Sequence, residues 1–212
     1  MAQTAAMVQA KVVKAGGAGA TADMTCAEIL ASFDPPIEFG SHEDMVGSKA
    51  GYQAEHVVPT SALHQSGRSG PTMAGCSGYS TPGAMTWMVG DGQSAGMEHK
   101  LLTDPMREFS QANDLAGQQA PLNTWLDKYK DAAKDALKKG NPQRKTPDHL
   151  DRDSLIDAAA ECIRLAAAEA FDKMDPPVKP DTPLRNPWPA TNEQRAAAAA
   201  ASSAPGAGAA GV

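Results

Sequence analysis

A strand–loop–strand–helix pattern over residues 54–99 constrains the fold of this chain more than any other feature. The segment opens with a short predicted strand, roughly Ala54 to Val58, and Pro59 ends the backbone pairing that this strand can make. A short apolar run, Met85 to Val89, predicts a second strand, and helical patterning follows Gly96. The sequence therefore predicts an α+β fold with a short antiparallel hairpin plus helix at its centre and further helices around it.

The segments outside the two predicted strands are rich in turn-forming residues. Residues 37–52 carry glycines at three positions, which indicates loop and turns before the first strand. Residues 61–81, between the strands, are rich in glycine and serine, and we expect no buried element there. A loop this long inside a compact domain is uncommon unless it is functional.

Helical periodicity dominates the second half of the chain. After a first turn or two, Asp104 as cap and Pro105 at the first helical position predict that a helix restarts and runs to about Asn113. Apolar residues recur every third or fourth position from Leu122 to Leu137, and a second such stripe runs from Leu155 to Phe171. We expect these two helices to pack on each other and on the hairpin.

The domain boundaries follow from changes in composition. Residues 1–24 are rich in alanine and glycine and are interpreted as a leader or linker. Residues 25–174 form the predicted domain, with its core at about 53–113. Residues 175–212 are rich in proline and alanine and are expected to be extended or disordered, except that Trp188 is expected to dock on the body.

Charge and cysteine usage exclude several classes of protein. The chain has 212 residues and a net charge of −6, which argues against coating nucleic acid through bulk positive charge but not against local phosphate binding. No apolar run approaches the roughly 20 residues of a membrane span, and no ordinary signal peptide is visible. Cys26, Cys76 and Cys162 lie far apart without a CxxC pair, which excludes a cysteine-rich zinc ribbon; we expect reduced thiols.

Three residues of the central segment are suited to phosphodiester cleavage, which needs a deprotonated water, neutralised phosphate charge and a stabilised leaving oxygen. A divalent cation supplies the last two, and an imidazole with a near-neutral pKa supplies the first. Neighbours on a strand point to opposite faces, so Glu55 can face a cation and His56 the water if the strand end twists. His99, at the start of the following helix, is the best-placed residue to complete the cation site.

The same residues carry a resemblance to a known family. The string Glu-His-Val-Val-Pro at 55–59, followed by Tyr79, an apolar strand and Gly-x-x-His, resembles the HNH/endonuclease VII-like nucleases of the ββα-metal fold. It looks most like the GHH-type toxin domains of bacterial polymorphic toxin and type VI secretion systems. The resemblance covers roughly Gln53 to Asn113. It implies that Glu55 is the first metal ligand, His56 the general base and His99 the helix-borne ligand.

Two positions depart from the family pattern. Thr103 stands four residues after His99, where the zinc-type members have a second helical histidine, and Met97 stands where some toxin relatives have histidine. Two protein ligands leave several coordination positions to water, so Mg²⁺ or Mn²⁺ is expected, with Zn²⁺ as the alternative.

The resemblance also implies a biological setting. The protein would be an antibacterial DNase effector that is secreted by a specialised system and acts in the cytoplasm of the target cell. In the producing cell it would be neutralised by a dedicated immunity protein. Components of the secretion machinery are a further class of expected partner. Arg68, Lys100 and Arg107 are the candidates for phosphate contacts. The seven Lys and Arg residues of 128–145, set against Asp127, Asp131 and Asp135, give a local charge of +4, which fits equally well a face that follows duplex DNA and a solvated helix face with Asp/Lys pairs.

Other functions and other site residues stay open. The chain could be a non-enzymatic, secretion-associated adaptor that docks through its proline-rich tail. A cysteine hydrolase at Cys76 is a weaker alternative, because no helix N-terminus lies behind the thiol to lower its pKa. His64 is interpreted as an exposed loop residue, His42 and His149 as non-catalytic, and Glu98 as a less favoured substitute for Glu55.

Overall fold

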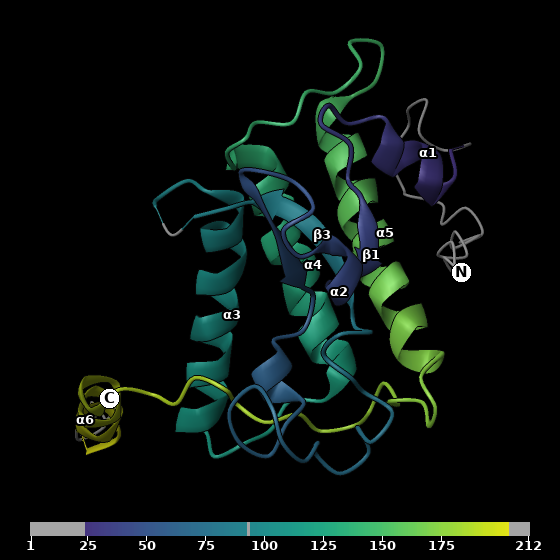
Figure 1. Cartoon of the computed structure of the whole chain (residues 1–212). Helices are drawn as coiled ribbons and strands as arrows, with labels where there is room; N and C mark the ends of the chain where they lie inside the picture. The colour runs from purple at the N-terminus through teal and green to yellow at the C-terminus, as the bar shows by residue number, and fades with distance from the viewer. Residues whose placement is uncertain (1–23, 93, 204–212) are drawn as a thin grey trace, which may run out of the picture.

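A three-stranded antiparallel sheet packs against a layer of three long helices in the computed structural model, which describes residues 24–92 and 94–203 (Figure 1). The sheet has the order β1-β3-β2, with bounds β1 Phe39–Ser41, β2 Tyr52–His56 and β3 Met85–Gly90. The helices, in spatial order, are α3 Glu98–Leu115, α4 Leu122–Lys139 and α5 Arg152–Asp172. The mixed α+β class predicted from the sequence is confirmed.

The sheet contains one strand more than the sequence indicated. The hairpin of β2 and β3 lies where it was predicted, although β2 begins two residues earlier, at Tyr52. The prediction of loop and turns for residues 37–52 was wrong in part, because β1 pairs with β3 there, Phe39 opposite Trp87. A physical reason is that β3 is buried from Thr86 onward, so the backbone groups on both of its edges need partners.

Helix α3 is continuous through Pro105, so the predicted restart at Asp104 was wrong. Proline removes one backbone hydrogen bond, the one that the carbonyl of Leu101 would otherwise accept. Leu102 and Met106, on either side of the proline, are almost completely buried, at 0% and 2% exposure. Tertiary burial of one continuous face therefore outweighs the local signal for a break.

Helices α4 and α5 form the core of the helical layer, as predicted. Helix α4 begins at Leu122, and its residues Trp125 and Tyr129 are fully buried. The indole Nε1 of Trp87, from the centre of β3, donates to the Tyr129 hydroxyl at 2.7 Å. This contact attaches the sheet to the middle of the helical layer, because it satisfies two buried polar groups at once.

The segment between β2 and β3 is packed against the body, and the expectation that it would hold no buried element was wrong. A short 3₁₀ helix, η1 Thr60–Ala62, follows β2 directly. Leu63, Cys76 and Tyr79 are each buried, with at most 6% exposure. The few apolar side chains of this glycine- and serine-rich segment therefore pack into the core, although the average composition of the segment indicates an exposed loop.

The proline-rich tail was expected to be extended or disordered; residues 175–191 pack on the body without helix or strand, and the expectation was wrong for residues 192–203, which form a helix. Val178 and Leu184 are buried, and Trp188 docks on the body, as predicted, with its backbone N–H donating to Ser110 Oγ at 3.0 Å. Helix α6, Asn192–Ser203, then projects away from the other helices (Figure 1). The predicted leader, apart from Met24, and residues 204–212 lie outside the described residues.

Two of the three cysteines form a disulfide, so the expectation of reduced thiols was wrong for this pair. Helix α1, Cys26–Ala31, lies against α5, and Cys26 is bonded to Cys162 across 136 positions of sequence. The sequence offered no CxxC or paired spacing, because the two helices meet only in the folded chain. Among the described residues, no helix is both long and apolar enough to cross a membrane.

Candidate functional site

Glu55 and His99 meet at one point, between the end of β2 and the first turn of α3. The Nδ1 atom of His99 lies 2.8 Å from Glu55 Oε2, and the two side chains are 16% and 14% exposed. The hydrogen bond with Glu55 raises the pKa of His99; burial opposes this, and the charges of Glu55 and Asp91 add to it. The convergence of these two residues, 44 positions apart, is what the sequence pattern predicted.

Gln53 belongs to the same cluster, although it was not among the site residues predicted from the sequence. It points to the same face of β2 as Glu55, because residues i and i+2 of a strand share a face. Its side-chain amide lies 2.5 Å from His99 Nδ1 and 3.5 Å from Glu55 Oε2. On the other side of the ring, His99 Nε2 lies 3.4 Å from Thr103 Oγ1, one turn along α3. The i, i+2 spacing was the signal that could have found Gln53.

The residue before His99 anchors this turn of the helix in the core. Glu98, the less favoured substitute for Glu55, is fully buried. Its carboxylate accepts from the Arg144 guanidinium at 2.6 and 2.9 Å and from the backbone N–H of Gly90 at 2.7 Å. Arg144 also donates to the carbonyl of Met88 at 2.7 Å. This network joins the start of α3 to the end of β3 and thereby fixes where His99 projects.

The structure does not bring His56 into contact with Glu55 or His99. His56 follows Glu55 on β2, opposite Thr86, and therefore points to the other face of the sheet. Its ring stacks on that of His42, in the short helix α2 His42–Met45, with 4.6 Å between centroids. Its Nε2 atom is buried without a hydrogen-bond partner among the described residues.

The protonation of His56 is strongly disfavoured. Its pKa is lowered to about 4, mainly by burial and further by the nearby His42 and the charge of Arg68, while the carbonyl of Thr81 acts in the opposite direction. The ring is therefore neutral near pH 7 and can accept a proton, although a base with so low a pKa has little driving force to do so.

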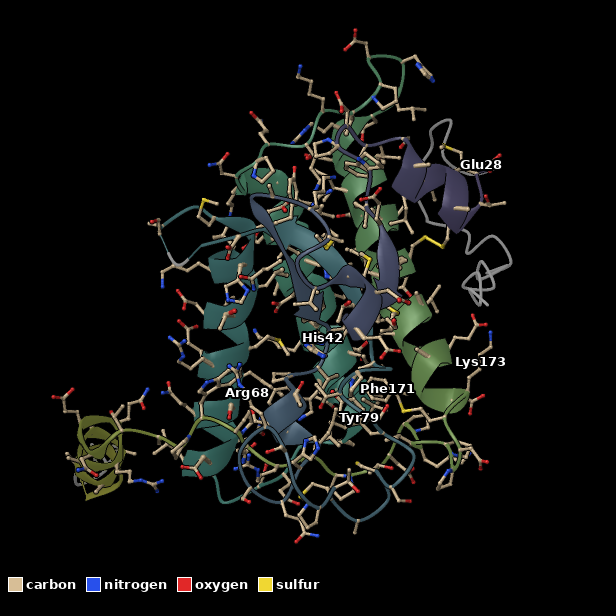
Figure 2. The ribbon with its side chains drawn as sticks, viewed as in Figure 1. Glu28, His42, Arg68, Tyr79, Phe171 and Lys173 are labelled. Carbon is tan, nitrogen blue, oxygen red and sulfur yellow. A yellow bond between two sulfur atoms is a disulfide. The ribbon has the colours of Figure 1, made fainter. Side chains whose placement is uncertain are left out.

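Arg68 connects the two sides of the site electrostatically. Its positive charge lowers the pKa of both His56 and His99, as the smallest of the causes that act on each ring. Figure 2 shows Arg68 in the long loop, beside the lower end of α3. The loop is held from behind by Arg185, whose guanidinium donates to the carbonyls of Ser61, His64 and Gly67, next in sequence to Arg68.

The other two candidates for phosphate contacts are engaged within α3. Lys100 Nζ lies 2.7 Å from the carboxylate of Asp104, and Arg107 NH1 lies 3.4 Å from the same carboxylate. Arg107 also lies over the ring of Trp188, 5.9 Å from its centroid. Both basic side chains are on the helix that carries His99. Each would have to break its ion pair with Asp104 before all of its N–H groups could bind a phosphate.

The lysines of α4 pair with acidic residues of α5. The interhelical ion pairs are Lys130–Glu161 at 3.5 Å, Lys134–Asp157 at 2.8 Å and Lys138–Asp153 at 2.9 Å. The excess positive charge counted within residues 128–145 is thus largely balanced by the neighbouring helix. This arrangement favours the interpretation of α4 as a solvated, ion-paired face over a face that follows duplex DNA.

Two loop residues differ from what the sequence indicated. His64 is 5% exposed, with Nδ1 2.9 Å from the Thr60 carbonyl, so the expectation of an exposed histidine was wrong. Cys76 is fully buried, and burial raises the pKa of its thiol. A nucleophilic cysteine needs the opposite, a lowered pKa with access to substrate, which argues against a cysteine hydrolase at this position.

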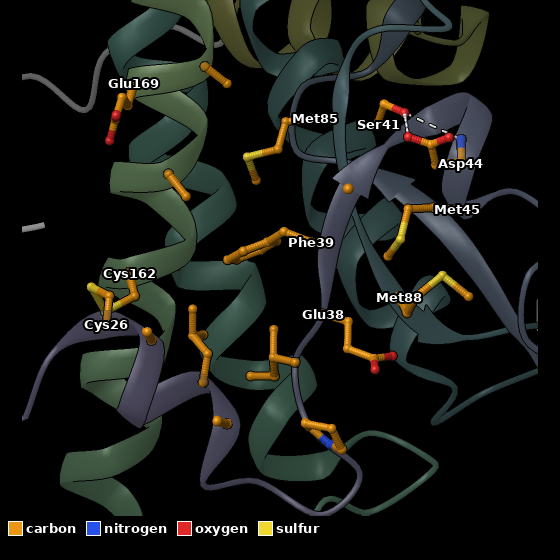
Figure 3. Close-up of a pocket in the computed structure, with 18 of the residues that line it drawn as sticks. Cys26, Glu38, Phe39, Ser41, Asp44, Met45, Met85, Met88, Cys162 and Glu169 are labelled. Atoms are coloured by element: carbon orange, nitrogen blue, oxygen red, sulfur yellow. Dashed lines mark hydrogen bonds between the residues drawn. A yellow bond between two sulfur atoms is a disulfide. The ribbon is translucent and has the colours of Figure 1, made fainter. Parts of the chain in front are cut away.

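A large apolar groove lies apart from the cluster of Gln53, Glu55 and His99. It encloses about 1190 Å³ between β1 and α2 on one side and α1 and α5 on the other. Its walls include Phe39, Met88 and the Cys26–Cys162 disulfide (Figure 3). The groove carries no convergent set of catalytic side chains, so it is not the candidate site.

Comparison with family models, curated proteins and solved structures gives no match for this chain. Within the described ranges, no group of three or more His, Cys, Asp or Glu side chains is arranged to hold a metal ion. The candidate site therefore depends on its own geometry: one carboxylate, one imidazole and one amide that converge beside an arginine-bearing loop.

Proposed function

We propose that this protein is a metal-dependent endonuclease that hydrolyses the phosphodiesters of DNA. The observation that carries the proposal is the meeting of Glu55 and His99 across a β-hairpin and the helix that follows it. Strand, strand and helix come in the order of the ββα-metal nucleases that the sequence resembles. Sequence spacing alone does not require two residues 44 positions apart to be in contact, so their contact supports a shared role.

The residues of the cluster fit a divalent cation. A carboxylate oxygen and an imidazole nitrogen are both donors that Mg²⁺, Mn²⁺ and Zn²⁺ accept, and Mg²⁺ and Mn²⁺ tolerate a ligand shell completed by water. Both side chains are partly exposed, which leaves room for water and a phosphate oxygen. When bound, the cation would neutralise the phosphate and stabilise the leaving oxygen.

The side chains have distinct proposed roles. Glu55 and His99 hold the cation, and Arg68 binds the scissile phosphate, because its charge already acts on the ring of His99. Lys100 and Arg107 steer the nucleic acid along α3 once they exchange Asp104 for phosphate. The role of general base is assigned to His56 by the resemblance alone: the ring is neutral near pH 7, but it lies on the other face of the sheet from Glu55 and His99, with Nε2 buried, so it acts at the cation only if the end of β2 twists.

A plasmid-nicking assay tests the proposal. Supercoiled DNA incubated with the protein and Mg²⁺ or Mn²⁺ should be nicked and linearised, and EDTA should stop the reaction. Glu55→Gln and His99→Ala should each lose about a hundredfold or more in rate, whereas the surface changes Glu108→Gln and His149→Ala should have no effect. Wild-type protein that leaves the plasmid intact with every divalent cation would refute the proposal and favour a non-enzymatic adaptor.

The His56 variant is a separate test of the base. Loss of a general base costs typically 10²–10⁴ in rate, so His56→Ala should reduce nicking by about a hundredfold while cation binding is retained. Full activity of this variant would assign the proton transfer to another group and leave His56 a structural role, stacked on His42.

We also propose, from the resemblance, the setting of an antibacterial effector. The protein would be exported by a specialised secretion system, act on DNA in the cytoplasm of the target cell and meet a cognate immunity protein in the producer. Growth arrest of a bacterial host on expression, relieved by Glu55→Gln, is the expected result. Equal toxicity of both proteins would contradict it.

A further inference from the structure

We infer that Gln53 is a third protein ligand of the cation, so that the site has a facial set of donors: a side-chain amide oxygen, a carboxylate oxygen and an imidazole nitrogen. This inference rests on the proposed metal-dependent function and adds a residue to it. Gln53 lies two residues before Glu55 on the same face of β2, and both approach His99.

The spacing of the three groups fits one face of an octahedral site. Gln53 Nε2, Glu55 Oε2 and His99 Nδ1 lie 2.5, 2.8 and 3.5 Å from one another. Neighbouring donors around a cation with metal–oxygen distances of about 2.1 Å are about 3 Å apart. Three side-chain tips at such spacing leave the opposite face for water and a phosphate oxygen.

The hydrogen bonding of the cluster points to the same conclusion. If His99 Nδ1 carries the proton that it shares with Glu55, the N–H group of Gln53 faces a second donor. Turning the amide by 180° removes that conflict and directs its oxygen at the same point as the carboxylate, because the two ends of an amide are interchangeable in shape. With the ring proton on Nε2 instead, the Nδ1 lone pair, the carboxylate oxygen and the turned amide oxygen all face one position, an arrangement of acceptors that a cation between them would stabilise.

Thr103 can accept a hydrogen bond from the tautomer that this requires. Its Oγ1 lies 3.4 Å from His99 Nε2, and an Nε2–H that donates to it leaves the lone pair of His99 on Nδ1, the atom that faces Gln53 and Glu55. The first turn of α3 is held in place by the buried pair of Glu98 and Arg144, so the ring cannot move away without breaking that network.

Isothermal titration with MnCl₂, read out as binding and not as activity, tests the inference. Gln53→Met keeps the length and loses the oxygen, so it should bind Mn²⁺ at least about tenfold more weakly than wild type. Gln53→Glu keeps the oxygen and adds charge, so it should bind at least as tightly as wild type. The matched control Gln119→Ala, at an exposed position, should bind like wild type.

The outcomes separate this inference from the proposed function. If wild type binds Mn²⁺, Glu55→Gln abolishes binding and Gln53→Met leaves it unchanged, the metal site stands and the role of Gln53 is overturned. That role is also overturned if Gln53→Glu weakens binding as much as Gln53→Met does. If wild type binds no Mn²⁺ at millimolar concentration, both the metal site and its third ligand are overturned. Circular dichroism of each variant establishes that it is folded.

Discussion

The neutral, buried state of His56 makes the stability of this protein depend on pH in a specific way. Its pKa is lowered from 6.5 to about 4, first by burial and then by the electrostatic effects of His42 and Arg68. Between these two values the unfolded chain binds a proton at this residue and the folded chain does not. The stability that His56 contributes is therefore complete above about pH 6.5 and is lost progressively as the pH falls towards 4.

The magnitude follows from the shift. A difference of 6.5 − 4 = 2.5 pKa units, at about 1.4 kcal/mol per unit, corresponds to about 3.5 kcal/mol in the free energy of unfolding, of which about 3 kcal/mol is lost by pH 4, where the folded-state ring is half protonated. This is a large fraction of the roughly 5–15 kcal/mol that holds a typical domain folded. His99 acts in the opposite sense: its raised pKa adds stability that is complete below 6.5 and is lost as the pH rises through the folded-state value.

Urea unfolding of wild type and of the variant His56→Phe, with EDTA present, isolates the contribution of His56 to the pH dependence of stability. Phenylalanine keeps an aromatic ring for stacking on His42 and cannot be protonated. From about pH 7.5 to about pH 4, wild type should lose about 3 kcal/mol more than the variant, because the other groups titrate alike in both proteins. Parallel stability curves would refute the reasoning. So would an NMR titration of wild type in which the His56 ring protonates near pH 6.5.

The buried and covalent links of the fold lead to two further predictions. Replacing both Cys26 and Cys162 by serine should lower the free energy of unfolding by up to about 5 kcal/mol, because the disulfide closes a loop of 136 positions. A reducing agent should destabilise wild type by a similar amount and leave the double variant unchanged. Wild type that keeps its full stability in reductant would contradict this prediction. Glu98→Gln should lower the free energy of unfolding by about 3–5 kcal/mol, because it leaves the guanidinium of Arg144 buried without its counter-charge. In the same urea assay, the control Glu108→Gln, at an exposed position, should lower it by about 0.5 kcal/mol or less. A cost for Glu98→Gln no larger than that of the control would show that the pair adds no stability.

The effect of the Glu98–Arg144 network on the proposed metal site can be measured separately from its effect on the stability of the fold. Because Glu98 fixes the turn that carries His99, the metal affinity of a folded Glu98→Gln protein reports how far the core positions the site. An isolated surface helix would present the same histidine without that constraint. The fold thus contributes orientation, and the cluster of Gln53, Glu55 and His99 contributes the donor atoms.

Short-range patterns in the sequence predicted a substantial part of this architecture. The apolar periodicity of Leu122–Leu137 and Leu155–Phe171 located α4 and α5, because one buried face per helix requires that spacing. The alternation and turn residues around β2 and β3 located the hairpin, and the start of α3 placed His99 close enough to meet Glu55. These features depend on neighbours a few positions apart, so a single sequence contains them.

Contacts between distant segments decided the rest. The strand β1, the disulfide between α1 and α5, and the ion pair of Glu98 with Arg144 join positions 44 to 136 residues apart, and no local pattern encodes such pairs. Pro105 stayed inside a helix because the burial of one continuous face outweighed one lost hydrogen bond. Sequence alone thus predicted that Glu55 and His99 meet. Only tertiary packing decided that Gln53 joins them and that His56 lies on the other face of the sheet, because which groups share a space depends on the whole fold.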